Sequence, residues 1–221
     1  MARTADPLDI PQRLVAAGLE LFLGQGYNAT GIQQLTSHAG VPKGSFYNHF
    51  ESKEAFAAVI IARYAEWLRR SWAHMMRSAP AEPMAAIRYV FGEMIAYHER
   101  APRTMGCLVG NFAAEIALSS PTCRKNLMAA QLAWRRRLSG LIAAGQAAHE
   151  IRADIDATAL AALTWSAWEG AILAMKVEDS TRPLRETTEL MLDKIYPPAS
   201  VFAGRSAKPR RKRQTLLSGN T

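Results

Sequence analysis

The polar side chains that follow Gly40 carry the chemistry that is most easily read from this sequence. Residues 42–50 bring five hydrogen-bonding side chains close together, namely Lys43, Ser45, Tyr47, Asn48 and His49. Lysine and asparagine can bind base edges in the major groove of DNA, whereas hydroxyl and imidazole groups can bind phosphates. Gly44 has no side chain to hold the backbone away from DNA, and Lys53 can add a phosphate contact. We therefore expect this stretch to bind double-stranded DNA, with base contacts from Lys43 and Asn48.

A second reactive group is the thiol of Cys107, in the sequence MGCLVGNFAAE of residues 105–115. We expect a short helix over about 106–118 with Cys107 in its first turn. Free N–H groups and the helix dipole there favour the thiolate and lower the thiol pKa, and Arg103 can help if it folds back. A thiolate can attack an enal, a quinone or a chloramine, or be oxidised to sulfenic acid. Two alternatives stay open, namely simple packing of Cys107 as a small hydrophobic residue and a noncovalent role in lining a pocket.

The remaining candidates for chemistry are few. The chain has two cysteines, which give neither a disulfide framework nor a set of zinc ligands, so we expect no metal and no cofactor. Cys123 can act as a resolving thiol for Cys107. A thiol enzyme with Cys107 as nucleophile and His98 as base is a remote alternative, because no phosphate loop, dinucleotide motif or oxyanion arrangement accompanies the pair.

The DNA-binding stretch needs two short helices to position it. Thr30 is a good N-cap for a helix over 31–39, whose apolar face comes from Ile32, Leu35 and Ala39. Gly40 suits the left-handed position that ends a helix. A tight turn is therefore expected between this helix and the polar stretch.

The second short helix is predicted over 43–50. Pro42 suits its first position, where a missing N–H has no consequence, and Val41 can anchor the turn in the core. Phe46 and Phe50 lie four residues apart, so both should face inward and leave the polar side chains outside.

These features occur together in TGIQQLTSHAGVPKGSFYNHF, residues 30–50, and closely resemble the helix-turn-helix domain of the TetR family of transcriptional regulators. The resemblance implies an all-α fold, with an N-terminal three-helix DNA-binding domain and a larger helical domain for effector binding and dimerisation. It also implies DNA contacts from Thr30, Lys43, Gly44, Ser45, Tyr47, Asn48, His49 and Lys53. Many relatives carry a basic arm before the first helix, but this chain has MARTADPLD, so a minor-groove contact there is in doubt.

The phrases GCLVGN and WEGAILAMK (residues 168–176) resemble a branch of that family which senses reactive electrophiles. This resemblance implies that Cys107 is the sensing cysteine and that Lys176 lies near it. Effector-lining candidates are Tyr97, Phe112, Trp134 and Trp168, with Met94, His98 and Trp165 as further possibilities. Each of these can also be an ordinary core residue.

Composition limits the class of protein. The chain has 221 residues, of which 49% are hydrophobic, and a formal net charge of +8. No run approaches the roughly 18 apolar residues of a membrane span, and no signal peptide is recognised, so a cytoplasmic protein without membrane contact is expected. Most of the excess charge lies in a tail with Arg205, Lys208, Arg210, Arg211, Lys212 and Arg213. The first 60 residues are not basic overall, so DNA binding must depend on a few placed groups.

Helix periodicity and caps predict nine helices and no strands, and the length of the chain together with the resemblance implies three segments. We expect a helix-turn-helix domain over 8–68, an effector-binding and dimerisation domain over 69–197, and a basic, disordered tail over 198–221. Ser52, Ser120, Asp156 and Thr181 are the predicted caps of later helices. The tail either adds nonspecific DNA affinity or only solvates the protein.

The last two helices are predicted to form a dimer surface. Small residues permit close helix approach, namely Ala159, Ala162, Ala167, Gly170, Ala171 and Ala174, and Trp165 and Trp168 supply area. The resemblance implies that these helices pair with their copies as a four-helix bundle, although this face can also pack within its own chain. Two recognition helices about 34 Å apart would then read two half-sites on one face of DNA.

The sequence thus favours a homodimeric repressor that binds a palindromic operator. Release would follow modification of Cys107 or binding of a small reactive or hydrophobic effector. The alternatives are the same repressor with a purely noncovalent hydrophobic effector, and an architectural DNA-binding protein without an effector.

Overall fold

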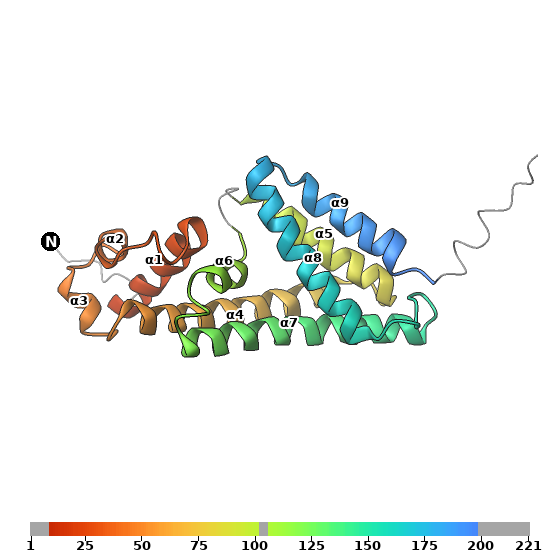
Figure 1. The fold of residues 1–221 in the computed structure, drawn as a ribbon, viewed down its shortest axis with the longest axis horizontal. Coiled ribbons are helices and arrows are strands. Elements are labelled where there is room, and N and C mark those ends of the chain that lie inside the picture. Colours follow the sequence, from red (N-terminus) through yellow and green to blue (C-terminus); the bar gives the residue numbers. More distant parts are fainter. Residues whose placement is uncertain (1–8, 102–105, 199–221) are drawn as a thin grey trace, which may run out of the picture.

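The computed structural model describes residues 9–101 and 106–198, and all regular structure in these two segments is helical. The all-α prediction is therefore confirmed for the described residues (Figure 1). The helices in chain order are α1 Ile10–Gln25, α2 Ile32–His38, α3 Gly44–Tyr47, α4 Lys53–Ser78, α5 Pro83–Arg100, α6 Leu108–Glu115, α7 Pro121–Ala147, α8 Ala157–Glu178 and α9 Arg182–Leu190, which continues as a π-helical turn over Met191–Ile195.

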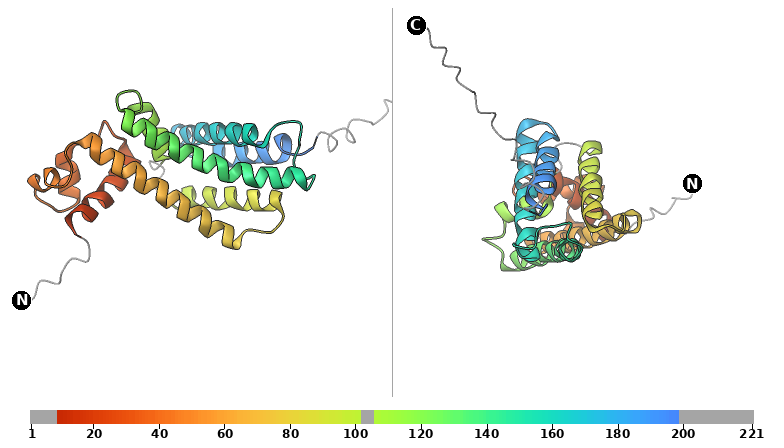
Figure 2. Two further views of the ribbon diagram at one scale, coloured as in Figure 1. Left: turned by 90° about the horizontal axis from the view of Figure 1, so that it is seen from below. Right: turned by 90° about the vertical axis from the view of Figure 1, so that its right-hand side faces the viewer.

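The molecule is elongated, with a small three-helix cluster at one end. Figure 1 shows α1, α2 and α3 grouped there, while α4 leaves this cluster and runs into a bundle with α5, α7, α8 and α9. Figure 2 shows the same separation from below, and α6 lies at the junction between the two parts (Figure 1). The predicted boundary at residue 68 falls inside α4, so one uninterrupted helix joins the two parts.

Aromatic packing holds the small cluster onto α4. Phe22, Phe46 and Phe56 are fully buried, and the Phe56 ring lies 5.9 Å from Phe22 and 5.3 Å from Phe46 between centroids. Phe50 completes the group at 4.7 Å from Phe56. The predicted inward Phe46–Phe50 pair therefore fixes α3 against the start of α4.

Three predicted N-caps are confirmed by their hydrogen bonds. Ser52 Oγ accepts from the N–H of Ala55 at 3.0 Å, and Ser120 Oγ accepts from the N–H of Cys123 at 3.2 Å. Asp156 accepts from Thr158 and Ala159 at the start of α8. The expected left-handed Gly40 is also confirmed, with φ of 64°.

Two predicted caps are wrong. Gly31 is the N-cap of α2, and the Thr30 hydroxyl instead donates to the carbonyl of Gly26 at 2.7 Å. Thr181 occupies the N-cap position of α9 but makes no capping hydrogen bond there, because its backbone is already helical. In both places a competing local geometry outweighs the cap preference of the residue type.

Two short helices are shorter than predicted. α3 covers Gly44–Tyr47 rather than 43–50, and Pro42 precedes its N-cap, Lys43. α6 begins at Leu108, after Cys107, and ends at Glu115. No helix within the described ranges is long and apolar enough to cross a membrane.

Candidate DNA-binding surface and effector pocket

The predicted recognition residues form an exposed surface on and around α3. Lys43, Tyr47, Asn48 and His49 are exposed, and Ser45 is half-buried. Gly44 is exposed, and a Cβ built on it would meet no other atom. The side chains proposed to bind DNA are therefore accessible, as that role requires.

Thr30 does not share this surface. Its side chain is fully buried, and its hydroxyl both donates to Gly26 and accepts from Gln25 Nε2 at 3.0 Å. Thr30 thus holds the α1–α2 turn together, and in this conformation its hydroxyl does not face a phosphate.

Lys53 is placed between two roles. Its Nζ lies 4.1 Å from the centre of the Tyr27 ring, as a cation–π pair, and the side chain is half-buried. Burial lowers the pKa of Lys53, and the nearby Glu115 carboxylate opposes this shift. The Lys53 ammonium group therefore lies at the junction between the two parts of the molecule rather than extending toward DNA.

Arg13 supports the turn between α2 and α3, a role that no sequence pattern indicates. From α1 its Nε donates to the carbonyl of Ala39 at 3.0 Å and its Nη2 to that of Gly40 at 2.8 Å. These carbonyls end α2, where helix hydrogen bonds are missing. Arg13 therefore fixes the angle at which α3 is presented.

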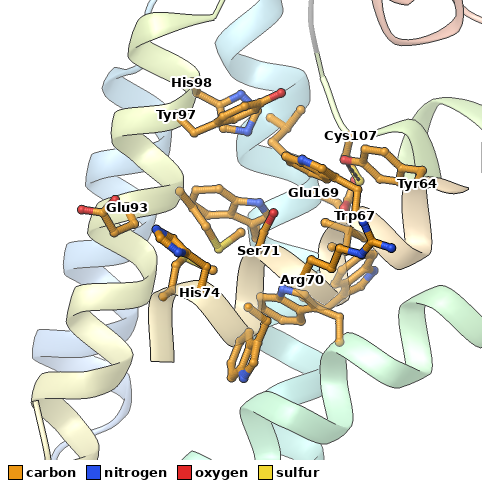
Figure 3. Close-up of a pocket in the computed structure, with 18 of the residues that line it drawn as sticks. Tyr64, Trp67, Arg70, Ser71, His74, Glu93, Tyr97, His98, Cys107 and Glu169 are labelled. Atoms are coloured by element: carbon orange, nitrogen blue, oxygen red, sulfur yellow. Dashed lines mark hydrogen bonds between the residues drawn. The ribbon is translucent and has the colours of Figure 1, made fainter. Parts of the chain in front are cut away.

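The bundle contains a cavity of about 440 Å³ between α4, α5, α7 and α8 (Figure 3). It falls within the roughly 300–1,000 Å³ of small-molecule sites. All five tryptophans of the chain line it, namely Trp67, Trp72, Trp134, Trp165 and Trp168. Aromatic contacts stabilise the wall of the cavity. The ring centroids of Trp134 and Trp165 lie 5.1 Å apart, and those of Phe91 and Trp168 lie 5.4 Å apart. This is the candidate effector pocket.

Most predicted effector residues line this pocket. Tyr97, Cys107, Trp134 and Trp168 do so, as do the further candidates Met94, His98 and Trp165. Phe112 and Lys176 are not among the lining residues. Phe112 is fully buried against the N-terminal cluster, at 5.1 Å from Phe22 and 5.8 Å from Tyr27 between ring centroids.

Cys107 is the N-cap of α6, but its environment differs from the expected one. The side chain is 8% exposed, and Tyr64 Oη donates toward its Sγ at 3.9 Å. Burial raises the pKa of the Cys107 thiol, and the Glu169 carboxylate raises it further, whereas the N–H of Gly110 lowers it. The expected low pKa is therefore wrong, because desolvation outweighs the helix N-terminus.

Glu169 is a pocket residue that sequence reasoning missed. It lines the cavity from α8 beside Cys107 (Figure 3), and burial raises the pKa of its carboxyl to about 7. A Cβ on Gly110 would overlap its Oε2. The only sequence signal was the position of Glu169 in WEGAILAMK, within an otherwise apolar helix.

Lys176 lies close to Gly106 and Asn111, which flank Cys107 in the sequence. Its Nζ donates to Asn111 Oδ1 at 3.1 Å, and a Cβ on Gly106 would lie 2.6 Å from its Cε. Gly106 and Gly110, on either side of Cys107, therefore leave room for Lys176 and Glu169. This packing explains why the segment GCLVGN has glycine at positions 106 and 110.

α6 connects the pocket to the N-terminal cluster. Cys107 precedes its first turn, and at its last residue Glu115 Oε2 accepts from the N–H of Asn28 at 2.6 Å, after α1. Asn111 also donates to the carbonyl of Leu23 at 3.5 Å. One short helix thus contacts the cavity at one end and the α1–α2 turn at the other.

Cys123 is remote from this arrangement. It is fully buried, and its thiol donates to the carbonyl of Glu54 at 3.8 Å. Cys107 contacts α4 at Tyr64, and the ten residues between Glu54 and Tyr64 correspond to about three helical turns. Both thiols are free, and this separation gives no support to the resolving role. The described residues contain no group of three or more His, Cys, Asp or Glu that could hold a metal ion.

An exposed stripe of small and apolar residues runs along α8. It consists of Ala159, Leu163, Ser166, Gly170, Leu173 and Val177, spaced at helical intervals. Leu173 and Val177 are 59% and 88% exposed, and a Cβ on Gly170 would meet nothing. Trp165, Trp168 and Ala171, predicted as part of this surface, are buried on the opposite side because the tryptophans line the pocket.

Comparisons with known proteins agree with this arrangement in two parts. Residues 14–60 match the family described as bacterial regulatory proteins, tetR family. Residues 83–191 match the tetracyclin repressor-like C-terminal domain.

Individual proteins are similar over most of the chain. The HTH-type transcriptional repressor DhaR of Mycobacterium sp. (strain GP1) is 34% identical over 197 residues, which cover 89% of this chain and 96% of DhaR. The crystal structure of regulatory protein TetR from Rhodobacter sphaeroides is 34% identical, with a TM-score of 0.77, and covers 82% of this chain and 96% of that one. The crystal structure of E. coli NemR in its reduced form is 25% identical, with a TM-score of 0.75, and covers 83% and 95%.

Proposed function

The chain belongs to the TetR family of bacterial transcriptional regulators, and we propose that it is a homodimeric repressor released from its operator when a small molecule occupies the tryptophan-lined pocket. The observation that carries this proposal is the contact of α6 with both the pocket and the α1–α2 turn. An enzyme with Cys107 and His98 is set aside, since the related proteins are regulators.

Operator binding is proposed to use the exposed surface of α3. Lys43 and Asn48 would contact bases, while Ser45, Tyr47 and His49 would bind phosphates. Gly44 would allow close approach of the backbone. Lys53 would contribute a weaker phosphate contact than the sequence implied, because it also faces Tyr27.

Dimerisation is proposed to use α8 and α9 and to bury the α8 stripe. Leu163, Leu173 and Val177 are large apolar residues left exposed on α8. Gly170 between them allows close helix approach. A two-fold pair of such faces would place two recognition surfaces on a palindromic site.

The proposed signal starts at Cys107 or in the cavity beside it. The Cys107 thiol can add across the C=C bond of an enal in the pocket. Its Sγ bonds to the β-carbon, and the thiol proton ends on the α-carbon. The adduct would fill part of the cavity and displace the first turn of α6. An effector acts only through its different affinity for the two states, and a hundredfold loss of operator affinity corresponds to about 2.7 kcal/mol.

A noncovalent effector is the second candidate, and it has its own supporting observation. Burial raises the pKa of Cys107, so little thiolate is present at neutral pH, while a cavity of about 440 Å³ lies beside it. The 25% identity with reduced NemR is weak support for thiol sensing in this chain.

A gel shift on DNA from the region upstream of the gene separates these candidates. Wild type, Cys107→Ser and Cys123→Ser would be tested with and without a small enal. Release of wild type and Cys123→Ser, but not of Cys107→Ser, would support covalent sensing. Equal release of all three would support a noncovalent effector, and absence of any specific shift would contradict the repressor proposal.

A further inference from the structure

The ammonium group of Lys53 is held on the face of an aromatic ring. Lys53 is the first residue of α4, and its Nζ lies 4.1 Å from the centre of the Tyr27 ring. Among the residues that the structure describes, no hydrogen bond or ion pair engages this ammonium group. A cation–π contact of this kind favours the held position about two- to fivefold over the released one.

The turn that carries Tyr27 is positioned by α6. The Tyr27 ring centroid lies 5.8 Å from that of Phe112, a fully buried residue of α6. The next residue, Asn28, donates its N–H to Glu115 at the end of α6, at 2.6 Å. A Cβ on the preceding residue, Gly26, would overlap the same carboxylate. The ring that holds Lys53 is therefore placed by the helix that also contacts the region of the pocket.

Contact with Tyr27 directs the Lys53 ammonium away from the proposed DNA-binding surface. Figure 1 shows α3 and the start of α4 at the far end of the N-terminal cluster, whereas α6 lies at the junction with the bundle. The Glu115 carboxylate of α6 also attracts the ammonium group. A phosphate contact beside α3 therefore requires Lys53 to leave the ring.

We propose that Tyr27 is a positioning residue for operator binding, because it holds Lys53 in a retracted position that competes with the phosphate contact. The inference rests on the proposed function, since it concerns an operator contact assigned there. In the free protein the ammonium group lies on the ring, and in the operator complex it lies on a phosphate. Tyr27 stabilises only the first of these states, so its ring lowers the affinity for the operator.

The test is a double-mutant cycle in operator affinity, measured with the full-length protein by polarisation of a labelled operator at several salt concentrations. Lys53→Met should bind more weakly, and the slope of its salt dependence should fall by about one. Tyr27→Leu should bind about two- to fivefold more tightly than wild type. In the Lys53→Met background, Tyr27→Leu should cause no further change. Equal effects of Tyr27→Leu in the two backgrounds, or a loss of affinity that requires Lys53, would overturn the inference.

A change in the electron density of the ring tests the same pair with little change in packing. Phenylalanine and trifluorophenylalanine placed at position 27 have similar shapes, but fluorine withdraws electrons from the ring face that attracts a cation. The trifluorinated protein should bind the operator more tightly than the phenylalanine protein, and this difference should vanish in Lys53→Met. Equal affinities of the two proteins that retain Lys53 would overturn the inference, even if Tyr27→Leu does not fold.

Lys43→Met is the matched control, because it removes another positive charge from the proposed DNA-binding surface. Lys43 is exposed at the N-cap of α3. Tyr27→Leu should keep its full effect on operator affinity in the Lys43→Met background. Loss of the effect there would indicate a general dependence on charge and would overturn the specific pairing with Lys53.

Failure of this inference can be told apart from failure of the proposed function. Specific binding of wild type to the operator supports the repressor proposal whatever the variants do. If wild type binds and Lys53→Met binds equally well at every salt concentration, Lys53 makes no phosphate contact and only the inference fails. Absence of specific binding by wild type contradicts the proposed function itself.

Discussion

Individual residues decide what the two sites can do. At the two ends of α3, Lys43 and Asn48 are exposed, as the proposed base contacts require. In the pocket, burial controls the protonation of Cys107, Glu169 and His98. Exposure therefore governs the proposed DNA contacts, whereas burial governs the chemistry of the pocket.

Replacing Asn48 with alanine should relax the base specificity of operator binding. Loss of a bidentate amide–base contact corresponds to about 1–3 kcal/mol of discrimination, while nonspecific affinity should change little. Binding to the operator and to single-base variants of it, measured at one salt concentration, tests this. Ser45→Ala is the comparison, since loss of a phosphate contact should weaken binding to all sequences alike.

Cys107 should react slowly with alkylating agents near neutral pH. Because burial raises the pKa of its thiol, its reaction rate should still be rising at a pH where the rate for a free cysteine has levelled off. Iodoacetamide labelling of Cys123→Ser, followed by mass spectrometry across pH, measures this. A rate that is already constant near pH 7 would show a thiolate and contradict the structural explanation.

Glu169 should make the stability of the protein depend on pH. Its pKa rises from 4.5 to about 7 on folding, so its contribution is fully present below pH 4.5 and is lost as pH rises through 7. A difference of one in pKa corresponds to about 1.36 kcal/mol. The free energy of unfolding of wild type should therefore fall by up to about 3 kcal/mol relative to that of Glu169→Gln. Urea unfolding of both proteins between pH 5 and 8 tests this, and parallel curves would contradict it.

At the scale of elements, α6 contacts both the region of the cavity and the N-terminal cluster, beside the continuous connection that α4 provides. Its last residue, Glu115, accepts from the N–H of Asn28 and packs against Gly26. Phe112 adds ring contacts to Phe22 and Tyr27. These contacts belong to the N-terminal core, although α6 lies more than 80 positions later in the chain.

Glu115→Ala should uncouple effector binding from operator release. Loss of one charge-assisted hydrogen bond to the α1–α2 turn should reduce the effector-dependent change in operator affinity severalfold, with effector affinity itself less affected. Gel shifts with and without effector measure this. Glu150→Ala is the control, because Glu150 also accepts from a backbone N–H, that of Met84 at 2.8 Å, at the far end of the bundle. A response equal to that of wild type would exclude this contact from the coupling.

The sequence predicted these elements better than their mutual packing. Ser52, Ser120 and Asp156 were recognised as caps because a cap depends on neighbours within three residues. Trp165 and Trp168 were assigned to the dimer surface, because composition does not tell which side of a helix faces the core. Arg13 and Glu169 were missed because their partners, Ala39 and Cys107, are distant in the sequence.

At the scale of the whole molecule, the exposed stripe on α8 should decide the oligomeric state. Leu173→Arg places a charge on the proposed interface, and we expect a monomer with greatly reduced operator affinity, since half-site binding loses the second contact. Light scattering after size exclusion measures the mass. Leu118→Arg is the control, because Leu118 is 94% exposed but lies outside the stripe. A dimer that persists in Leu173→Arg would move the interface elsewhere.

The placement of the tryptophans means that the tryptophan fluorescence of the protein reports on the pocket. All five line the pocket and none lies in α1, α2 or α3. Emission excited at the indole band therefore comes from the walls of the candidate effector pocket, whereas the helices of the proposed DNA-binding cluster, α1, α2 and α3, contain no tryptophan. A titration followed by tryptophan emission reads occupancy of the cavity directly, and polarisation of a labelled operator reads the other end of the molecule. Recorded together in one cuvette, the two signals give the order in which filling of the cavity and departure from DNA occur.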